Sequence, residues 1–302
     1  MTLPAVILLI FSAGLHATWN LVSKRESPSV AFMLVMVFLG SLCLLPVLFW
    51  SHGLPPAFSG LIWVYLALTG ASQALYYVGL AGAYRHGDLS VTYPLARATP
   101  VLFVALLTWL LGRGAPLSGL AILGMLLVVG GCLTIPVRRF SEFRWRNYWN
   151  LACLMALLAA CGTAGYSLLD SQALALLRSA AGETSGISVL PVVYSLLEGL
   201  STSLWLALIV AIRPSERQAL RKIDHSRLTQ AAVAGIFMVL AYTLVLFAMT
   251  FVTNVSYVVA FRQLSIPLGA MLGVLVLKEP PYLPKLVGLI VTFVGLILVG
   301  IG

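Results

Sequence analysis

Long uninterrupted apolar segments alternate with short polar breaks along the whole chain. Each segment has about the length of the roughly 20 apolar residues that a helix needs to cross the hydrocarbon core of a bilayer. Backbone polar groups in lipid must be paired within their own segment, so these runs are expected to be α-helices. The pattern predicts ten spans, at residues 3–22, 30–50, 60–83, 90–111, 117–136, 148–169, 189–212, 229–250, 254–277 and 285–301.

Composition supports a membrane location. Of the 302 residues, 61% are hydrophobic and 9% are charged, with a mean hydropathy of +1.02. Soluble domains carry about 25% charged residues. The longest breaks, 137–147, 170–188 and 213–228, are too short for a soluble domain. The sequence therefore predicts an all-α integral membrane protein that crosses the bilayer about ten times.

Positive charge gathers in alternate loops between the predicted spans. One set of loops carries fourteen basic residues, namely Lys24, Arg25, Arg85, Arg138, Arg139, Arg144, Arg146, Arg213, Arg217, Arg221, Lys222, Arg227, Lys278 and Lys285, and the other carries Arg113 and Arg178. The positive-inside rule places the first set in the cytoplasm and both termini outside. We therefore attribute the net charge of +9 to the control of topology in a cell (inner) membrane, and we expect no nucleic-acid partner.

The two halves of the chain repeat one another. At an offset of 165 residues, identical residues recur at Leu75 and Leu240, Tyr77 and Tyr242, Ala83 and Ala248, and Arg97 and Arg262. Residues 1–147 and 148–302 each contain five predicted spans. An odd number of spans inverts the second copy in the membrane, as in secondary transporters whose site lies between the repeats. We therefore expect two inverted five-helix repeats.

The motifs along the chain resemble the EamA-type branch of the drug/metabolite transporter superfamily. They are LHATWNLVSK (15–24), AYRHGDLSVTYPLAR with Pro100 (83–100), FRQLSIPLGAMLGVLVLKEP (261–280) and GLIVTFVGLILVG (288–300). The resemblance covers essentially the whole chain and implies alternating access by two inverted bundles that move small organic metabolites, often outward. Family members often end the fourth span with Gly-Glu, whereas this chain has Gly112-Arg113 there and Lys278-Glu279 after the ninth.

Two arginines within predicted spans are the strongest site candidates. Arg97 and Arg262 lie about seven residues into matching spans. An arginine at a helix centre costs roughly 2.5–3.5 kcal/mol to insert, so such residues usually have a function. A guanidinium facing a central cavity can hold a carboxylate, phosphate or phosphonate through paired hydrogen bonds. The alternative is a structural arginine that bonds helix ends or pairs with a buried acid.

Acidic residues within spans are rare, and Glu198 lies in the middle of one. It is a candidate proton-coupling carboxylate or the counter-ion of Arg97 or Arg262. Asp170, at the end of the predicted sixth span, is expected at the membrane interface.

Polar and aromatic residues on several spans are candidates for the cavity wall. His16 and Asn20 share one face of the first span with Trp19 adjacent, and Tyr166 is the expected counterpart of Trp19 in the second half. The remaining candidates for substrate binding are Gln73, Tyr77, Tyr93, Tyr242 and Tyr257. Helix packing is the alternative for each of them.

Enzyme and metal motifs are not found in the sequence. It contains no Gly-x-Ser-x-Gly elbow, HExxH or phosphate loop, and Cys43, Cys132, Cys153 and Cys161 form no CxxC. We therefore expect no enzyme, metal or cofactor. The sequence predicts a secondary transporter, with export favoured, of a small and partly anionic metabolite, acting as a monomer or homodimer. A non-transport membrane subunit and a membrane-embedded enzyme using Glu198 or His16 are the alternatives.

Overall fold

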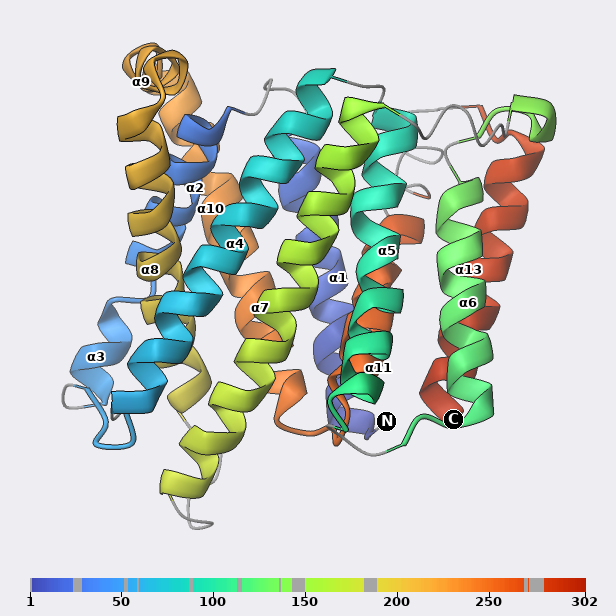
Figure 1. Cartoon of the computed structure of the whole chain (residues 1–302), viewed down its shortest axis with the longest axis horizontal. Coiled ribbons are helices and arrows are strands. Elements are labelled where there is room, and N and C mark those ends of the chain that lie inside the picture. Colours follow the sequence, from blue (N-terminus) through green and yellow to red (C-terminus); the bar gives the residue numbers. More distant parts are fainter. Residues whose placement is uncertain are drawn as a thin grey trace.

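The computed structural model of the protein describes residues 2–23, 29–51, 54–58, 60–86, 89–112, 116–135, 137–142, 150–181, 189–268, 271 and 280–302, except the side chains of 20–23, 84, 89–95 and 142. Within these ranges every regular element is a helix (Figure 1). They are α1 (Leu3–Ser23), α2 (Val30–Leu42), α3 (Pro46–Trp50), α4 (Gly60–His86), α5 (Leu89–Leu110), α6 (Gly119–Thr134), η1 (Phe140–Glu142), α7 (Leu151–Ala181), α8 (Leu190–Ile212), α9 (Pro214–Arg221), α10 (His225–Met249), α11 (Val255–Phe261), η3 (Arg262–Leu264) and α13 (Leu283–Ile301).

Six helical segments are long and apolar enough to cross a membrane. They are Val30–Trp50, Gly60–Ala83, Leu151–Ala181, Leu190–Ile212, His225–Met249 and Leu283–Ile301. Four shorter apolar helices, Leu3–Trp19, Ala96–Leu110, Gly119–Thr134 and Val255–Leu268, lie where the remaining predicted spans were expected. The protein is therefore an all-helical membrane protein.

Two predicted boundaries differ from the structure, and the second span, Val30–Trp50, has its predicted bounds but contains a break. The polar stretch after residue 169 was expected to be a loop, but α7 continues to Ala181. The break at 213–228 contains the short helix α9, which begins with a proline in its first turn. The second span is interrupted between α2 and α3, because Pro46 has no N–H to offer the carbonyl of Leu42. The N–H of Leu45 donates to that carbonyl instead, at 3.1 Å.

Side-chain caps set the beginnings of several helices. Ser29 and Ser118 accept hydrogen bonds from the backbone N–H groups of Phe32 and Ala121, at the first turns of α2 and α6. Asp224 accepts from Arg227 N at the start of α10. Each cap satisfies one of the N–H groups that a helix N-terminus leaves unpaired, which fixes where the helix starts.

The helices pack side by side as a bundle, with α4 against α7, α1 against α10, and α6 against α13 (Figure 1). The α6–α13 contact depends on small residues, since a Cβ on Gly288 would lie 2.7 Å from the carbonyl oxygen of Gly131. Gly40 of α2 and Gly235 of α10 touch in the same way. Such close approach of backbones is typical of helix packing in membranes.

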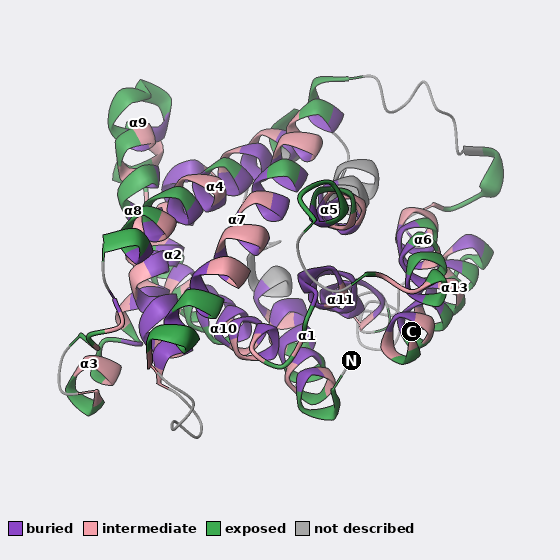
Figure 2. Ribbon diagram, turned by 60° about the horizontal axis from the view of Figure 1, so that its bottom comes forward, coloured by how far each residue is buried: buried purple, intermediate pink, exposed green. Residues whose placement is uncertain are grey.

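Polarity is arranged with the apolar side chains outside. Large hydrophobic residues such as Phe49, Trp109 and Ile301 are at least 70% exposed on the outer faces (Figure 2). Arg97, Asp170, Glu198 and Arg262 are instead buried. Lipid accepts an apolar outer surface, whereas ionisable groups within a membrane belong in the interior of the bundle.

An ion pair between the exposed Arg85 and the buried Glu216 ties α9 to the bundle at the end opposite both chain termini (Figure 1). Glu216 is 2% exposed and accepts a hydrogen bond from Arg85 at 2.9 Å, on the last turn of α4. Its other carboxylate oxygen accepts from the backbone N–H of Ala31, at 3.1 Å, in the first turn of α2. The α9 segment therefore links the ends of α2 and α4.

Candidate functional site

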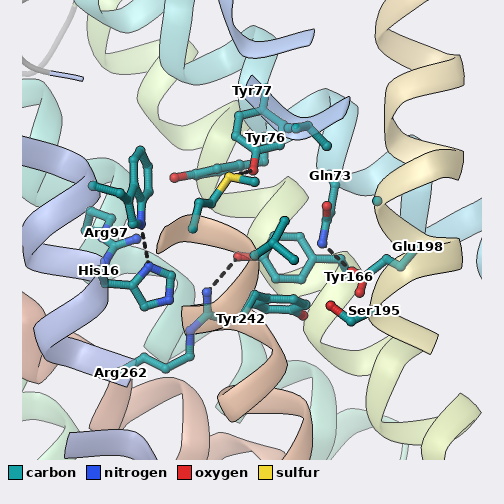
Figure 3. Close-up of a pocket in the computed structure, with 15 residues that line it drawn as sticks. His16, Gln73, Tyr76, Tyr77, Arg97, Tyr166, Ser195, Glu198, Tyr242 and Arg262 are labelled. Carbon is teal, nitrogen blue, oxygen red and sulfur yellow. Dashed lines mark hydrogen bonds between the residues drawn. The ribbon is translucent and has the colours of Figure 1, made fainter. Parts of the chain in front are cut away.

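A polar pocket lies at the centre of the bundle, between helices from both halves of the chain (Figure 3). Its walls come from α1, α2, α4, α5, α7, α8, α10 and η3. Figure 3 shows His16, Arg97 and Arg262 on one side, Gln73, Glu198 and Ser195 on the other, and Tyr166 and Tyr242 between them. We call these the arginine side (His16, Arg97, Arg262) and the carboxyl side (Gln73, Glu198, Ser195, together with Asp170 described below).

Arg262 is the central cation of the pocket. It stands at the start of η3, directly after α11, and is 6% exposed. Its Nη2 donates to the hydroxyl of Tyr166 at 3.1 Å, and its guanidinium carbon lies 5.6 Å and 5.1 Å from the ring centroids of Tyr166 and Tyr242. Such cation–π contacts stabilise a guanidinium that has lost its water. Its Nη1 is buried and has no hydrogen-bond partner in the described part of the chain.

Arg97 approaches from α5 and is held close to Arg262. Its Nη2 donates to Ser265 Oγ at 2.8 Å, and the same hydroxyl donates to the carbonyl oxygen of Arg262 at 3.0 Å. Ser265 therefore connects the two arginines through one hydroxyl. This arrangement concentrates positive charge in a place where water is scarce, which strengthens the attraction for an anion.

His16 and Trp19 lie one turn apart on α1. Trp19 Nε1 donates to His16 Nδ1 at 2.7 Å. A neutral imidazole that accepts at Nδ1 carries its proton on Nε2. The tryptophan therefore selects a tautomer with an N–H donor on the other side of the ring.

Four tyrosines form an aromatic wall across the pocket. Tyr76 packs edge-to-face against Tyr77 and Tyr166, with ring centroids 4.9 Å and 6.2 Å apart, and Tyr166 meets Tyr242 at 5.5 Å. Tyr77 also donates to Met238 Sδ at 2.8 Å. Edge-to-face pairs hold one another in place, so the wall is a rigid support for Arg262.

Glu198 faces the pocket from α8 and is 2% exposed. Its Oε1 accepts a hydrogen bond from the side-chain amide of Gln73 on α4. The amide oxygen of Gln73 in turn accepts from Thr202 Oγ1 at 2.9 Å. Glu198 Oε2 is buried without a hydrogen-bond partner among the described residues.

Asp170 corrects a prediction, because it was expected at the membrane interface and is fully buried. Its Oδ1 accepts from Thr69 at 2.5 Å and from Tyr194 at 2.9 Å, and its Oδ2 accepts from the hydroxyl of Tyr242. These donors lie on α4, α8 and α10. The extension of α7 beyond residue 169 carries Asp170 into this junction of four helices.

The expected direct ion pair between Glu198 and an arginine is not formed. Among the described residues, the ion pair with atoms within 4.0 Å is Arg85–Glu216, outside the pocket. Glu198 is bonded to Gln73 instead, and the tyrosines occupy the space between the two sides. The two sides of the pocket therefore keep opposite charges apart.

Most residues predicted for the site come together in the pocket. They are His16, Trp19, Gln73, Tyr77, Arg97, Tyr166, Glu198, Tyr242 and Arg262. Tyr257 is half-buried and does not line the pocket. The side chains of Asn20 and Tyr93 lie outside the described residues. Sequence reasoning missed Asp170 and the pocket residues Ser195 and Met238.

The described residues contain no group of three His, Cys, Asp or Glu side chains placed to hold a metal ion. The pocket and its surroundings offer hydrogen-bond donors, a pair of guanidinium groups and buried carboxyl groups. Such a set can bind and orient a small polar molecule through hydrogen bonds and charge.

Comparison with known proteins shows the fold alone. No family model and no curated protein sequence matches the chain. A solved crystal structure of a protein superposes with a TM-score of 0.71 at 15% sequence identity, over 98% of this chain and 97% of that one. The arrangement of helices in this chain is therefore similar, from end to end, to one that has been observed experimentally.

Proposed function

We propose that the protein is a secondary transporter that moves a small, partly anionic organic metabolite across a cell (inner) membrane by alternating access. The observation that carries the proposal is the pair of buried arginines, Arg97 and Arg262, that line a central pocket. Nη1 of Arg262 is a buried donor with no partner among the described residues. A carboxylate, phosphate or phosphonate bound there would satisfy that donor.

The proposed framework is ten helices in two inverted repeats, and the helix packing supports it. The offset of 165 residues that relates the arginines also relates the starts of α4 and α10, Gly60 and His225. The packing partners exchange in the same way when α4 is matched with α10, α7 with α1, and α2 with α8. The contact of α4 with α7 then matches that of α10 with α1, and the contact of α2 with α10 matches that of α8 with α4. This exchange is what a pseudo-two-fold axis produces.

The helix contacts made by glycines follow the same exchange. Gly124 of α6 meets Gly295 of α13, and Gly131 of α6 meets Gly288 of α13. Each glycine on one helix has a counterpart on the other that makes the reciprocal contact, as in a self-complementary interface. A pocket on such an axis can open alternately to either side when one repeat tilts against the other.

The pocket must widen to accept a metabolite. Its volume is about 40 Å³, far below the roughly 300–1,000 Å³ of pockets that hold drug-sized ligands. The small volume fits a closed form of a transporter. A transporter passes through such a form between its two open states, so we expect binding to be coupled to helix movement.

The orientation of the protein in the membrane is proposed from the charge of its loops. The end of the bundle that carries α9, with Arg213, Arg217 and Arg221, is proposed to face the cytoplasm, and both termini the outside. We retain export as the proposed direction, and a monomer or homodimer as the proposed assembly.

A thermal-shift screen of the purified protein against amino acids, phosphonates, sugar phosphates and nucleosides tests binding, because a ligand of the native state raises its apparent stability. We expect hits that carry an anionic group. The Arg97→Ala and Arg262→Ala variants should lose the ligand-induced shift. Arg217→Ala, an exposed arginine on α9, is the matched control and should keep it. An unchanged shift in the doubly substituted protein would contradict the proposal.

A further inference from the structure

Two carboxyl groups lie on the carboxyl side, Glu198 in the wall of the pocket and Asp170 in the helix junction beside it. Asp170 is fully buried and Glu198 is 2% exposed. Glu198 lies one helical turn after Tyr194, whose hydroxyl donates to Asp170 at 2.9 Å. The turn of α8 from Tyr194 to Glu198 therefore brings both carboxyl groups to the same buried junction of helices. No Lys or Arg nitrogen among the described residues lies within 4.0 Å of either.

The two carboxyls have different partners. Asp170 accepts three hydrogen bonds from the hydroxyls of Thr69, Tyr194 and Tyr242. Such donors favour the ionised form of a carboxyl. Glu198 accepts one, from Gln73 at Oε1, and its buried Oε2 has no partner in the described chain. An O–H at Oε2 would give that atom a partner in the Asp170 carboxylate.

We propose that Asp170 and Glu198 form a proton-binding site. Glu198 Oε2 carries the proton and donates a hydrogen bond to the ionised carboxylate of Asp170. Two buried like charges at one junction repel one another, so the pair favours holding one proton between its two groups, as in other carboxyl pairs. Proton loss leaves both groups as carboxylates, and proton uptake restores the O–H···O⁻ bond.

The groups that face this pair come from every surrounding helix. On α7 and α8 they are Tyr166 and Tyr194, on α4 Tyr76 and Tyr77, and on α10 Tyr242; the charged or titratable groups beyond them are Arg262 of η3, Arg97 of α5 and His16 of α1. Arg262 and its positive charge face Glu198 across Tyr166 and Tyr242 (Figure 3). An anion bound to Arg262 would cancel part of that charge and tighten the hold on the proton.

The proton site therefore has a consequence for transport, which rests on the proposed function. An anionic ligand and the proton are expected to favour one another's binding. By linkage, a change in proton affinity caused by the ligand equals the change in ligand affinity caused by the proton. The site would supply the coupling ion, although its existence does not depend on transport.

Infrared spectroscopy of the purified full-length protein at neutral pH tests the site without any ligand. A protonated carboxyl has a C=O stretch separate from the carboxylate bands. We expect one such band in the wild type, its loss in Glu198→Gln, and its retention with a shifted frequency in Asp170→Asn, where the acceptor changes. Glu216→Gln removes another buried carboxyl, one paired with Arg85, and Asp224→Asn an exposed one; both should keep the band unchanged.

The wild-type spectrum alone can overturn the inference, because a protein with no protonated-carboxyl band at neutral pH holds no such proton. A band that survives unchanged in Glu198→Gln would also overturn it. Ligand-induced stabilisation that depends on Arg97 and Arg262, without the band, would leave the proposed transport function standing and remove the proton site. The band without any ligand binding would leave the proton site standing and remove the support for the proposed transport function.

Discussion

On the arginine side of the pocket, Arg262 and Arg97 donate hydrogen bonds to the hydroxyls of Tyr166 and Ser265, and Arg262 also stacks on two aromatic rings. On the carboxyl side, Asp170 accepts three hydrogen bonds from three helices, and Gln73 ties Glu198 to Thr202. Arg262 therefore keeps a donor for a ligand, its Nη1, which has no partner among the described residues, whereas the carboxyls are built into the junctions between helices.

This difference separates two roles that a buried charge can have. A donor without a partner costs free energy until something binds it, so Arg262 Nη1 favours a bound anion. A carboxylate with three donors is stabilised in place, so Asp170 fixes α4, α7, α8 and α10 relative to one another. Substitutions on the carboxyl side should reduce stability, and substitutions on the arginine side should reduce ligand affinity.

The largest effect is expected from Asp170→Ala. It leaves the hydroxyls of Thr69, Tyr194 and Tyr242 without their acceptor in a buried place. We expect the free energy of unfolding to fall by about 3 kcal/mol, roughly one for each abandoned donor. Denaturant unfolding of the purified protein measures it. Asp224→Asn is the control, since asparagine also caps helices well, and a loss as small in Asp170→Ala as in this control would remove the structural role of the carboxyl.

Gln73→Leu should come next. Leucine keeps a similar volume but removes the amide that donates to Glu198 and accepts from Thr202. We expect a loss of about 2 kcal/mol in the free energy of unfolding. The comparison is the same unfolding measurement on Ser201→Ala. This substitution removes a single hydrogen bond, from the Ser201 hydroxyl to the carbonyl of Leu66, between the same two helices. An equal or smaller loss in Gln73→Leu would mean that the Gln73 bridge contributes little.

Arg262→Lys keeps the charge of the arginine side but loses the planar fork. A lysine cannot stack its head group across Tyr166 and Tyr242 in the same way. We expect affinity for the best ligand of the thermal-shift screen to fall about tenfold, which corresponds to about 1.4 kcal/mol, with little change in unfolding. Titration calorimetry measures the affinity. Arg217→Lys should have no effect, and a wild-type affinity in Arg262→Lys would show that charge alone suffices.

Tyr166→Phe should give the smallest effect. The ring and its contact with Arg262 remain, and only the hydroxyl that accepts from Nη2 is lost. We expect ligand affinity to change by less than about tenfold, because the guanidinium keeps its contacts with both rings and loses only a hydrogen bond that does not itself contact the ligand. A larger loss than in Arg262→Lys, in the same calorimetric titration, would show that the hydroxyl itself contacts the ligand.

The sequence predicts the helices well where hydropathy alone decides them. The spans predicted at 189–212 and 285–301 correspond to α8 and α13, which end at the predicted residues, Ile212 and Ile301. The predicted end of the sixth span was wrong, because Asp170, Ser171 and Gln172 lower the hydropathy at a point where the helix continues. The segment that follows, Ala173–Ala181, is rich in Ala and Leu, which are strong helix formers, and this was the signal that could have extended it.

The site was predictable where a charge stands alone in an apolar run. Arg97, Arg262 and Glu198 are such residues, and all three line the pocket. Asp170 was missed because its burial depends on the extended α7 and on hydroxyls from three other helices, a tertiary arrangement that no local pattern encodes. Ser195 and Met238 are small or apolar residues of ordinary helix faces, so sequence alone gives no reason to select them.

The most direct test of the central claim is counterflow in proteoliposomes, with the ligand that best stabilises the purified protein. Labelled ligand outside should accumulate in vesicles preloaded with unlabelled ligand. Accumulation should be lost when Arg97 and Arg262 are both replaced by alanine, and should persist with Arg217→Ala. A ligand that binds at the arginines but shows no counterflow, or equal counterflow in the doubly substituted protein, would contradict the account.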